Sequence, residues 1–414
     1  MSRDIGDAGF YGKRLMDHTA RTRYGRITEE GVAEVRARIG RQYPIREPFL
    51  RYINADSIRH VAHGIGDPNP LWTDPEHAAS TRYGRLVAPP ALLYGVAWSA
   101  WDMRRGEGLP GVHGLHAGDA WTYFRPLLAG DEVRAVSQLV ALDERDGRFA
   151  GRSYMQVRRF DYFDQDDALV ARCDMSAVRA ERDAGRERGE KSGVALARYS
   201  PEDIERIEAL YDAEEIRGSI PRLWDDVAVG DSIGSVVKGP LTVTDMISWT
   251  AAVGSPHVRS GQFWLAYRRR SPRIAVIDPE TGIPDTIERV HWDPFMASEI
   301  GMSAPYDYGS QRGAWSSHLL TNWCGDDGHL TSLAVQYRGL VYLGDTLVFS
   351  GSVTDRWRDH AGGGHVECEI QASTQRGDVV LKGTASVALR TAEGVLPVLP
   401  LEPEALQSER RRVS

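Results

Sequence analysis

The pattern of hydrophobic positions along this chain predicts the same series of helices and strands twice. In the first copy, a short helix is expected over 55–64, opened by Asn54 or Asp56. The stretch 90–103 is apolar nearly all round and predicts a long buried helix. Four segments with polar turns between them then read as strands, over 120–127, 131–142, 148–160 and 168–180.

The second copy repeats these elements in the same order. A helix is expected over 241–252, a buried helix over 311–323, and strands over 330–337, 345–355, 364–374 and 379–390. A unit of this length that occurs twice indicates a duplicated domain. It excludes a solenoid, whose period is about 20–50 residues.

The pattern divides the 414 residues into five segments. We expect a helical extension over 1–45, a first domain over 46–180, a charged linker and helix over 181–224, a second domain over 225–395, and a tail over 396–414.

Composition narrows the class of protein. The net charge of −8 argues against a surface for nucleic acid. No run approaches the ~18 apolar residues that span a bilayer, and the chain starts without an apolar signal region, so we expect a cytoplasmic protein without a membrane partner. The three cysteines are scattered, which makes disulfides and a metal site unexpected.

Short motifs recur together with the elements. The segment 66–71 reads Gly-Asp-Pro-Asn-Pro-Leu, and an offset of 219 pairs Trp72 with His291 and Asp74 with Asp293. Gly130-Asp131 recurs as Gly344-Asp345 at an offset of 214. The first motif resembles the D-x-N-P-L-H signature of MaoC-like, (R)-specific enoyl-CoA hydratases. The loop that ends in His291 resembles the histidine loop of double-hotdog dehydratases, and the Gly-Asp pairs resemble a turn of that fold.

The resemblance implies an α+β protein with two hotdog domains in tandem, each a long central helix wrapped by an antiparallel sheet, joined as a pseudo-dimer. It further implies hydration or dehydration of an enoyl or 3-hydroxyacyl thioester, such as a coenzyme A ester, without a cofactor. A homo-oligomer is expected.

Adding water across a conjugated double bond requires a base for the water, an acid for the α-carbon and a donor for the enolate oxygen. By resemblance, His291 is the base. The backbone amide of Gly309 is the donor, and Tyr308 stands where those enzymes often have a histidine.

Neither copy holds the full set of catalytic residues. The first copy keeps Asp67 and Asn69, but Trp72 occupies the histidine position and Pro89-Pro90 offers no N–H. We therefore expect it to be scaffold, with Trp72 in a wall that leaves room for a large substrate. The second copy keeps His291, but has Thr286 and Glu288 in place of Asp and Asn.

Three interpretations follow. His291 works with Glu288 or Asp293 in the second copy; or Asp67 and His291 form one site across the pseudo-dimer; or His291 is a hydrogen-bonded loop residue of a catalytically silent binding protein. A lyase or cyclase acting on a substrate other than a coenzyme A ester remains a further alternative.

Overall fold

The computed structural model describes residues 26–97, 109, 112–147, 151–181, 196–299, 302–396 and 398. The first half of the chain contains α2 (Glu29–Arg36), β1 (Gln42–Pro44), α3 (Ala55–Ile65), α4 (Pro70–Thr73), α5 (Pro75–Ser80), α6 (Leu92–Ala97), β2 (His113–Tyr123), β3 (Arg134–Gly147), β4 (Gly151–Phe163) and β5 (Leu169–Ala180).

The second half contains α8 (Pro201–Asp212), β6 (Ser232–Lys238), α9 (Val243–Val253), α10 (Gly261–Arg270), β7 (Ala275–Ile277), β8 (Pro284–Thr286), the 3₁₀ helix η4 (Ile287–His291), α11 (Pro294–Glu299), α12 (Gly309–Cys324), β9 (His329–Tyr337), β10 (Leu347–Arg358), β11 (Gly364–Thr374) and β12 (Val379–Leu389). The domain boundaries expected at 46–180 and 225–395 stay a prediction.

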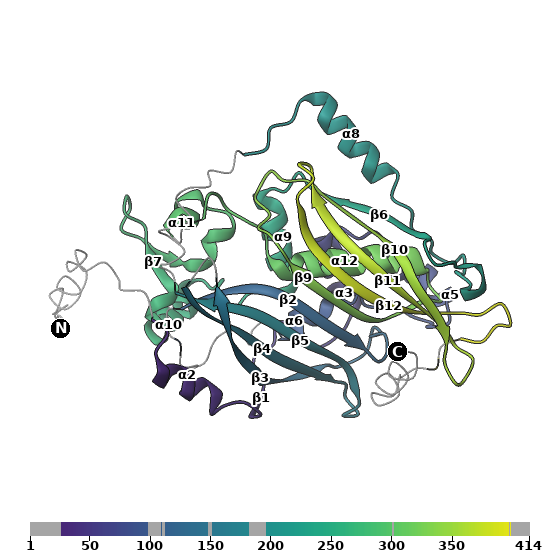
Figure 1. The fold of residues 1–414 in the computed structure, drawn as a ribbon, viewed down its shortest axis with the longest axis horizontal. Helices are drawn as coiled ribbons and strands as arrows, with labels where there is room; N and C mark the ends of the chain where they lie inside the picture. The colour runs from purple at the N-terminus through teal and green to yellow at the C-terminus, as the bar shows by residue number, and fades with distance from the viewer. Residues whose placement is uncertain are drawn as a thin grey trace, which may run out of the picture.

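Ten strands form one continuous sheet in the order β1-β3-β4-β5-β2-β9-β12-β11-β10-β6. The two halves meet where β2 pairs antiparallel with β9, with Ala120 opposite Ala334. Figure 1 shows the two sets of strands side by side around this pairing, which we call the β2–β9 seam. The seam confirms the expected edge-to-edge pseudo-dimer and leaves neither inner strand with an open edge.

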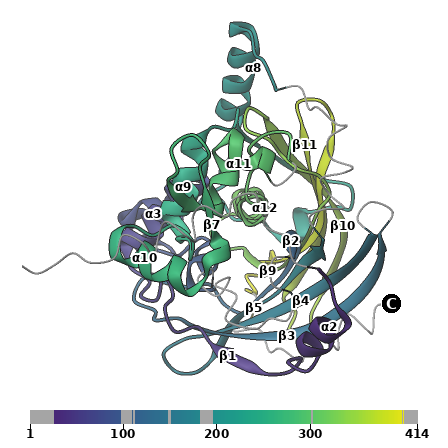
Figure 2. The ribbon, with the colours of Figure 1, turned by 90° about the vertical axis from the view of Figure 1, so that its left-hand side faces the viewer.

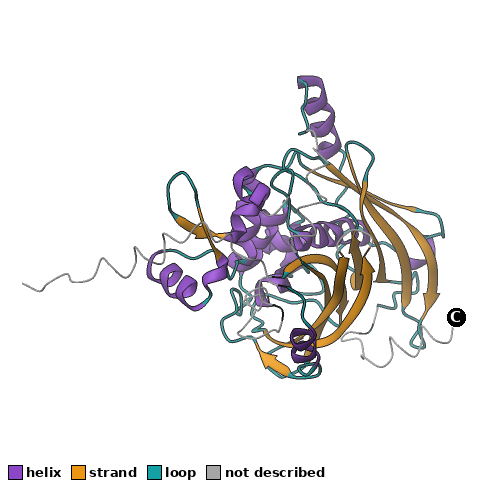
Figure 3. Ribbon diagram, turned by 60° about the vertical axis from the view of Figure 1, so that its left-hand side comes forward, coloured by secondary structure: helices purple, strands orange, loops and turns teal. Residues whose placement is uncertain are grey.

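The sheet curves around α12, which Figure 2 shows end-on. This helix is buried along nearly all of its 16 residues, because Trp315, Leu319, Leu320 and Trp323 point into the core. Figure 3 shows most helices gathered on the concave side of the sheet. No helix among the described residues is long and apolar enough to cross a membrane.

The first-half central helix, expected over 90–103, is described as α6 over Leu92–Ala97, and all six residues are buried. Outside the described residues lie the rest of that expected helix, residues 1–25 of the expected extension, residues 182–195 of the linker and helix expected over 181–224, and most of the tail expected over 396–414.

Two strands and several strand ends differ from the expected pattern. β2 begins at His113 instead of residue 120, and β3 begins at Arg134 because Asp131 closes the preceding turn by accepting the Leu128 amide at 3.0 Å. The edge strands β1 and β6 were not predicted. β6 contains Gly234 at φ 78°, which interrupts the alternation that marks a strand.

Helices α3 and α9 pack on each other across the pseudo-twofold axis. Their contact is close, since a Cβ on Gly64 would lie 2.3 Å from Cβ of Ala252. A buried lysine fixes the same region: Lys238 Nζ on β6 donates to the carbonyls of Ile65 at 2.9 Å and Gly66 at 2.8 Å, at the C-terminus of α3. A cation at a helix C-terminus is favourable, so Lys238 holds the first-half loop against the second half.

Replacing Lys238 with methionine should lower the free energy of unfolding by on the order of 3 kcal/mol, because it strips two buried carbonyls of their donor and removes the cation near Asp67. Lys382→Met on the exposed face of β12 is the matched control and should change it by less than about 0.5 kcal/mol. Equal effects of the two changes in urea unfolding would show that Lys238 does not tie the halves together.

Candidate functional site

Equivalent hydrogen bonds fix which residues of the two halves correspond. Ahead of the first central helix, Ala88 N donates to Leu127 O at 2.8 Å; ahead of the second, Asp307 N donates to Val341 O at 2.9 Å. The donors are 219 residues apart and the acceptors 214. The loops and helix starts therefore correspond at an offset of 219, and the strands that follow correspond at 214.

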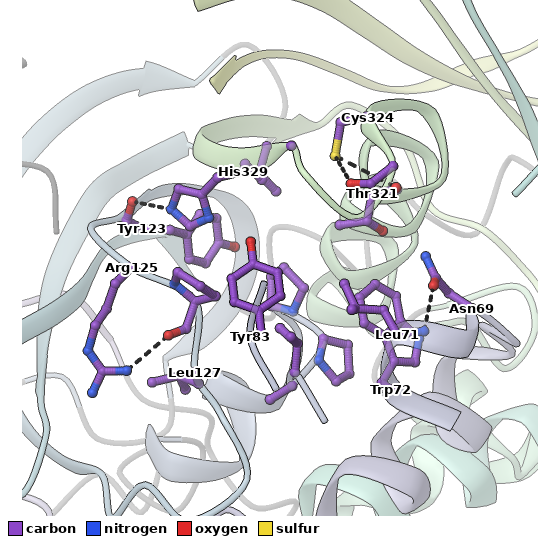
Figure 4. A pocket seen from close by; sticks show the side chains of 18 of the residues that line it. Asn69, Leu71, Trp72, Tyr83, Tyr123, Arg125, Leu127, Thr321, Cys324 and His329 are labelled. Atoms are coloured by element: carbon purple, nitrogen blue, oxygen red, sulfur yellow. Dashed lines mark hydrogen bonds between the residues drawn. The ribbon is translucent and has the colours of Figure 1, made fainter. Parts of the chain in front are cut away.

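The first half carries a pocket of about 610 Å³, part of it open to solvent. Its walls come from the motif loop, the start of α6, the end of β2, and the C-terminal end of α12 with the first residues of β9. Figure 4 shows the side chains converging on this space. The lining residues are Asn69, Leu71, Trp72, Tyr83, Val87, Ala88, Pro89, Pro90, Leu93, Tyr123, Arg125, Pro126, Leu127, Thr321, Cys324, Gly325, Gly328, His329 and Leu330.

Most polar side chains that line this pocket already have hydrogen-bond or ion-pair partners within the protein. Asn69 accepts the Leu71 amide at 3.0 Å, and Arg125 pairs with Asp131 and Asp164 at 2.7 Å each. His329 Nε2 lies 3.1 Å from the carbonyl of Tyr123, and burial lowers the pKa of its imidazole to about 4. Pro89 and Pro90, which stand at the positions of Tyr308 and Gly309, carry no N–H. The first half thus has no amide donor at the position equivalent to Gly309.

Asp67 lies behind the pocket wall instead of in it. Its Oδ1 accepts the Asn69 amide at 3.2 Å and lies 3.3 Å from Nε2 of His318 on α12. Burial raises the pKa of the Asp67 carboxyl to about 7, and the positive charge of Lys238 opposes that rise. His318 is nine residues along α12 from Gly309, or about 13 Å at the rise of a helix. The contacts of Asp67 therefore lie in the middle of α12, whereas those of His291 lie near its start.

At the offset of 219, the residues that line the first-half pocket correspond to different residue types in the second half. Trp72 corresponds to His291, Pro90 corresponds to Gly309, and Asn69 corresponds to Glu288. The second half therefore presents a histidine and a backbone amide where the first half has an indole and a proline.

His291 ends η4 and is held by one carbonyl and two aromatic rings. Its Nδ1 lies 2.8 Å from the carbonyl oxygen of Tyr306, and its ring stacks on Tyr308 with centroids 3.8 Å apart. Burial lowers the pKa of His291 to about 4. Because a carbonyl only accepts, Nδ1 carries the hydrogen of the neutral ring and Nε2 keeps a lone pair.

Glu288 supports Tyr308 rather than contacting His291 directly. Its Oε1 accepts the Tyr308 hydroxyl at 2.9 Å and its Oε2 accepts the Ser255 hydroxyl at 2.5 Å. Burial raises the pKa of this carboxyl, although both hydroxyl donors act in the opposite direction. Glu288 thus fixes the ring on which His291 stacks.

Asp293 has partners other than His291. It pairs with Arg289 and accepts the Met296 amide at 3.0 Å, so it caps α11. Burial alone would raise the pKa of Asp293, but these partners hold it below its ordinary value. Of the two carboxylates expected beside His291, only Glu288 belongs to the same cluster.

The N-terminus of α12 faces this cluster. Tyr308 is the N-cap residue and Gly309 is the first helical residue, so the Gly309 amide has no acceptor within the helix. Such amides lie at the positive end of the helix dipole and suit a developing oxyanion. Glycine fits closely there, because a Cβ would lie 3.0 Å from Tyr337 and 3.1 Å from His116, and both side chains would have to shift to admit it.

The sequence pattern missed the residues that the second-half insertion contributes. Ser255 and His257 lie between α9 and α10, and His257 Nδ1 is 2.8 Å from the Tyr267 hydroxyl. Burial lowers the pKa of His257 to about 4, assisted by the nearby Arg259 and His291. The segment has no counterpart in the first copy, so aligning the repeats could not place it.

Two halves of one continuous sheet, joined at the β2–β9 seam and curved around a central helix, define a double-hotdog fold. Residues 37–173 match the family described as "FAS1-like, dehydratase domain region". A UPF0336 protein of Streptomyces avermitilis is 30% identical over 123 residues, which cover 29% of this chain and 78% of that protein.

Solved structures agree on the fold. A MaoC-like dehydratase aligns with a TM-score of 0.60 at 18% identity, over 86% of this chain and all of its own. A conserved protein of Mycobacterium tuberculosis, described as having a double hotdog fold, aligns with a TM-score of 0.51 at 14% identity, over 85% of this chain and 96% of its own. By its sequence similarity the chain belongs to the same family as the UPF0336 proteins, and it has the fold of MaoC-like dehydratases.

Gly309→Ala should lower turnover about 10-fold or more and the free energy of unfolding by about 1 kcal/mol, because the added methyl displaces the first turn of α12 from Tyr337 and His116. Gly339→Ala is the control, since its Cβ would meet Val380 at an ordinary 3.4 Å. Full activity of the Gly309 variant on an enoyl thioester would rule out a role for this helix start.

Proposed function

We propose that the protein hydrates an enoyl thioester, or dehydrates the corresponding 3-hydroxyacyl thioester, at a site in its second half. One observation carries the proposal: the neutral imidazole of His291, with its Nδ1–H held by the Tyr306 carbonyl, lies against Tyr308 at the start of α12. The match of residues 37–173 to a dehydratase family model supports the reaction class, and this geometry supports the location.

In hydration, His291 Nε2 takes a proton from water while the water oxygen bonds to the β-carbon. The π-electrons of the double bond move toward the thioester carbonyl, and the negative charge that develops on its oxygen is stabilised by the Gly309 amide. The α-carbon then takes a proton. Dehydration runs the same steps in reverse.

Glu288 acts as a positioning residue in this scheme. It holds the Tyr308 hydroxyl at 2.9 Å and is anchored by Ser255, so the face of Tyr308 that packs on His291 is fixed. Asn69 and Asp67 keep structural roles in the first-half loop, where each accepts a backbone amide.

The first-half pocket is lined by large side chains, among them Trp72, Tyr83 and Leu93. Room for a substrate larger than a short linear enoyl chain stays a prediction, because this pocket lies on the first-half side. The second candidate is a ligand-binding protein without catalytic activity. The first-half pocket favours it, because Pro90 in that pocket has no N–H to donate. We infer a thioester substrate from the reaction class; a coenzyme A ester and a homo-oligomer are part of the proposal.

His291→Ala should lower turnover of a trans-2-enoyl thioester by on the order of 10²-fold or more, because the base for water is lost. Trp72→His is the matched variant and should leave turnover in the His291→Ala background unrestored, since Pro90 still lacks the donor. Unchanged hydration by the alanine variant would remove His291 from the mechanism. No hydration of any thioester by the parent protein would favour the silent binder.

The pH dependence of kcat/KM should report the lowered pKa of His291. The base form is required and is lost as pH falls through the folded pKa, so activity should persist down to about pH 5 and decline near pH 4. The residual rate of His291→Ala should lack this acid limb. An acid limb centred near pH 6.5, the value of an unperturbed histidine, would contradict the assignment.

A further inference from the structure

A buried histidine–carboxylate pair lies at the β2–β9 seam. Asp119 on β2 has no exposed side-chain surface and accepts three hydrogen bonds of 2.7 Å, from Nε2 of His116, the hydroxyl of Tyr94 and the hydroxyl of Tyr337. The donors come from β2, α6 and β9. We call these four residues the Asp119 network.

The network lies against the first turns of α12. A Cβ on Gly309 would lie 3.1 Å from Nδ1 of His116, and a Cβ on Gly313 would lie 2.5 Å from the hydroxyl of Tyr94 and 2.8 Å from that of Tyr337. Two glycines one turn apart thus make room for the network. His116 Nδ1 therefore faces the residue whose amide is the proposed oxyanion donor.

The pseudo-twofold axis places His116 in the wall of the second-half site. At the strand offset of 214, His116 corresponds to Leu330 and Tyr337 corresponds to Tyr123. Both Leu330 and Tyr123 line the described pocket of the first half. His116 comes from the first half of the chain but occupies the equivalent wall position on the second-half side.

The same offset matches Asp119 with Leu333, a buried residue of the core. Replacing a leucine with a buried carboxylate is costly unless the charge is paired. The seam is held by a leucine at the equivalent position, so cohesion of the halves does not require the network. The carboxylate lies only on the side where His291 and Gly309 lie, which favours a chemical role.

The hydrogen bonds of Asp119 also fix the histidine. Burial alone would raise the pKa of Asp119, but His116 and the two tyrosines hold it below its ordinary value, so the carboxylate is ionised. An ionised carboxylate only accepts, so Nε2 of His116 carries a hydrogen. Its Nδ1, which lies 3.1 Å from the Cβ position of Gly309, is then the ring nitrogen placed to pass a proton to or from a substrate.

We propose that His116, oriented by Asp119, is the second proton-transfer residue of the site and exchanges the proton of the substrate α-carbon. This inference rests on the proposed hydratase function. In hydration, Nδ1–H of the protonated His116 ring gives its proton to Cα as the enolate collapses, while His291 has taken a proton from water. Solvent then removes the proton from His291 and returns one to His116, so that one water is added overall.

The pair also supplies what the second-half loop lacks. The loop has Thr286 at the position of the first-half Asp67, and both oxygens of Glu288 already accept hydroxyls. Asp293 is paired with Arg289. Of the three atoms nearest the Cβ position of Gly309, Nδ1 of His116 is the one ring nitrogen.

Two reactions separate the roles of the two histidines. The first is hydration of a trans-2-enoyl thioester. The second is exchange of α-hydrogen for deuterium in a saturated acyl thioester in D₂O, followed by mass spectrometry, which needs a base at Cα and the oxyanion donor but no attack by water. His291→Ala should lose hydration by about 10²-fold and keep exchange within about 3-fold. His116→Gln should lose both by about 10²-fold.

His365→Gln is the matched control. His365 is a buried histidine on β11 that pairs with Asp359 at 3.1 Å, remote in sequence from the site, and both rates should stay within about 3-fold of the parent. His116→Ala distinguishes loss of the imidazole from loss of folding. If the variant is folded and lacks only the ring, added imidazole should restore α-hydrogen exchange. Asp119→Asn should lower exchange about 10-fold with KM nearly unchanged, as expected of a positioning residue.

Hydration and exchange by His116→Gln within about 3-fold of the parent would overturn the inference while leaving His291 as the base of the proposed function. The absence of imidazole rescue in folded His116→Ala would also overturn it. By contrast, a parent protein that neither hydrates an enoyl thioester nor exchanges α-hydrogen refutes the proposed function itself.

Discussion

The pairing of β2 with β9 is the constraint on which the rest of the structure depends. Because the two strands join antiparallel around Ala120 and Ala334, one continuous sheet relates the halves by a pseudo-twofold axis. Each central helix then starts beside a strand of the other half. Residues such as His116 and Leu330 are therefore delivered across the seam, and neither half could complete its pocket walls alone.

Equivalent positions of the two halves differ in chemistry. The first-half pocket has Trp72, Pro90 and Leu330 where the second-half candidate site has His291, Gly309 and His116. The same packing scheme thus gives an apolar space on one side and a polar cluster on the other. Burying these polar groups costs free energy unless each has hydrogen-bond partners. His291 has a carbonyl partner, Glu288 accepts two hydroxyls, and Asp119 accepts three hydrogen bonds.

The sequence predicted the fold well because its signals are periodic and occur twice. The α12 helix, the four long strands of each half and the joined sheet follow from hydrophobic pattern and repetition. The edge strand β6 did not, since Gly234 breaks its alternation. In the site, the histidine loop and the glycine at the helix start could be located from the repeat. Ser255 lies in an insertion without a counterpart. His116 becomes visible only when the strand pairing is known, because Gly309 and Tyr337, which it lies against, are more than 190 residues away in the chain.

The central claim is that the second half holds the chemistry and the first half does not. A crystal structure of the complex with a stable thioether analogue of an enoyl thioester tests it most directly. The account predicts the carbonyl oxygen within about 3 Å of the Gly309 amide, with the β-carbon facing His291. A complex in which the carbonyl group instead lies in the first-half pocket, against Trp72 and Pro90, would contradict the account.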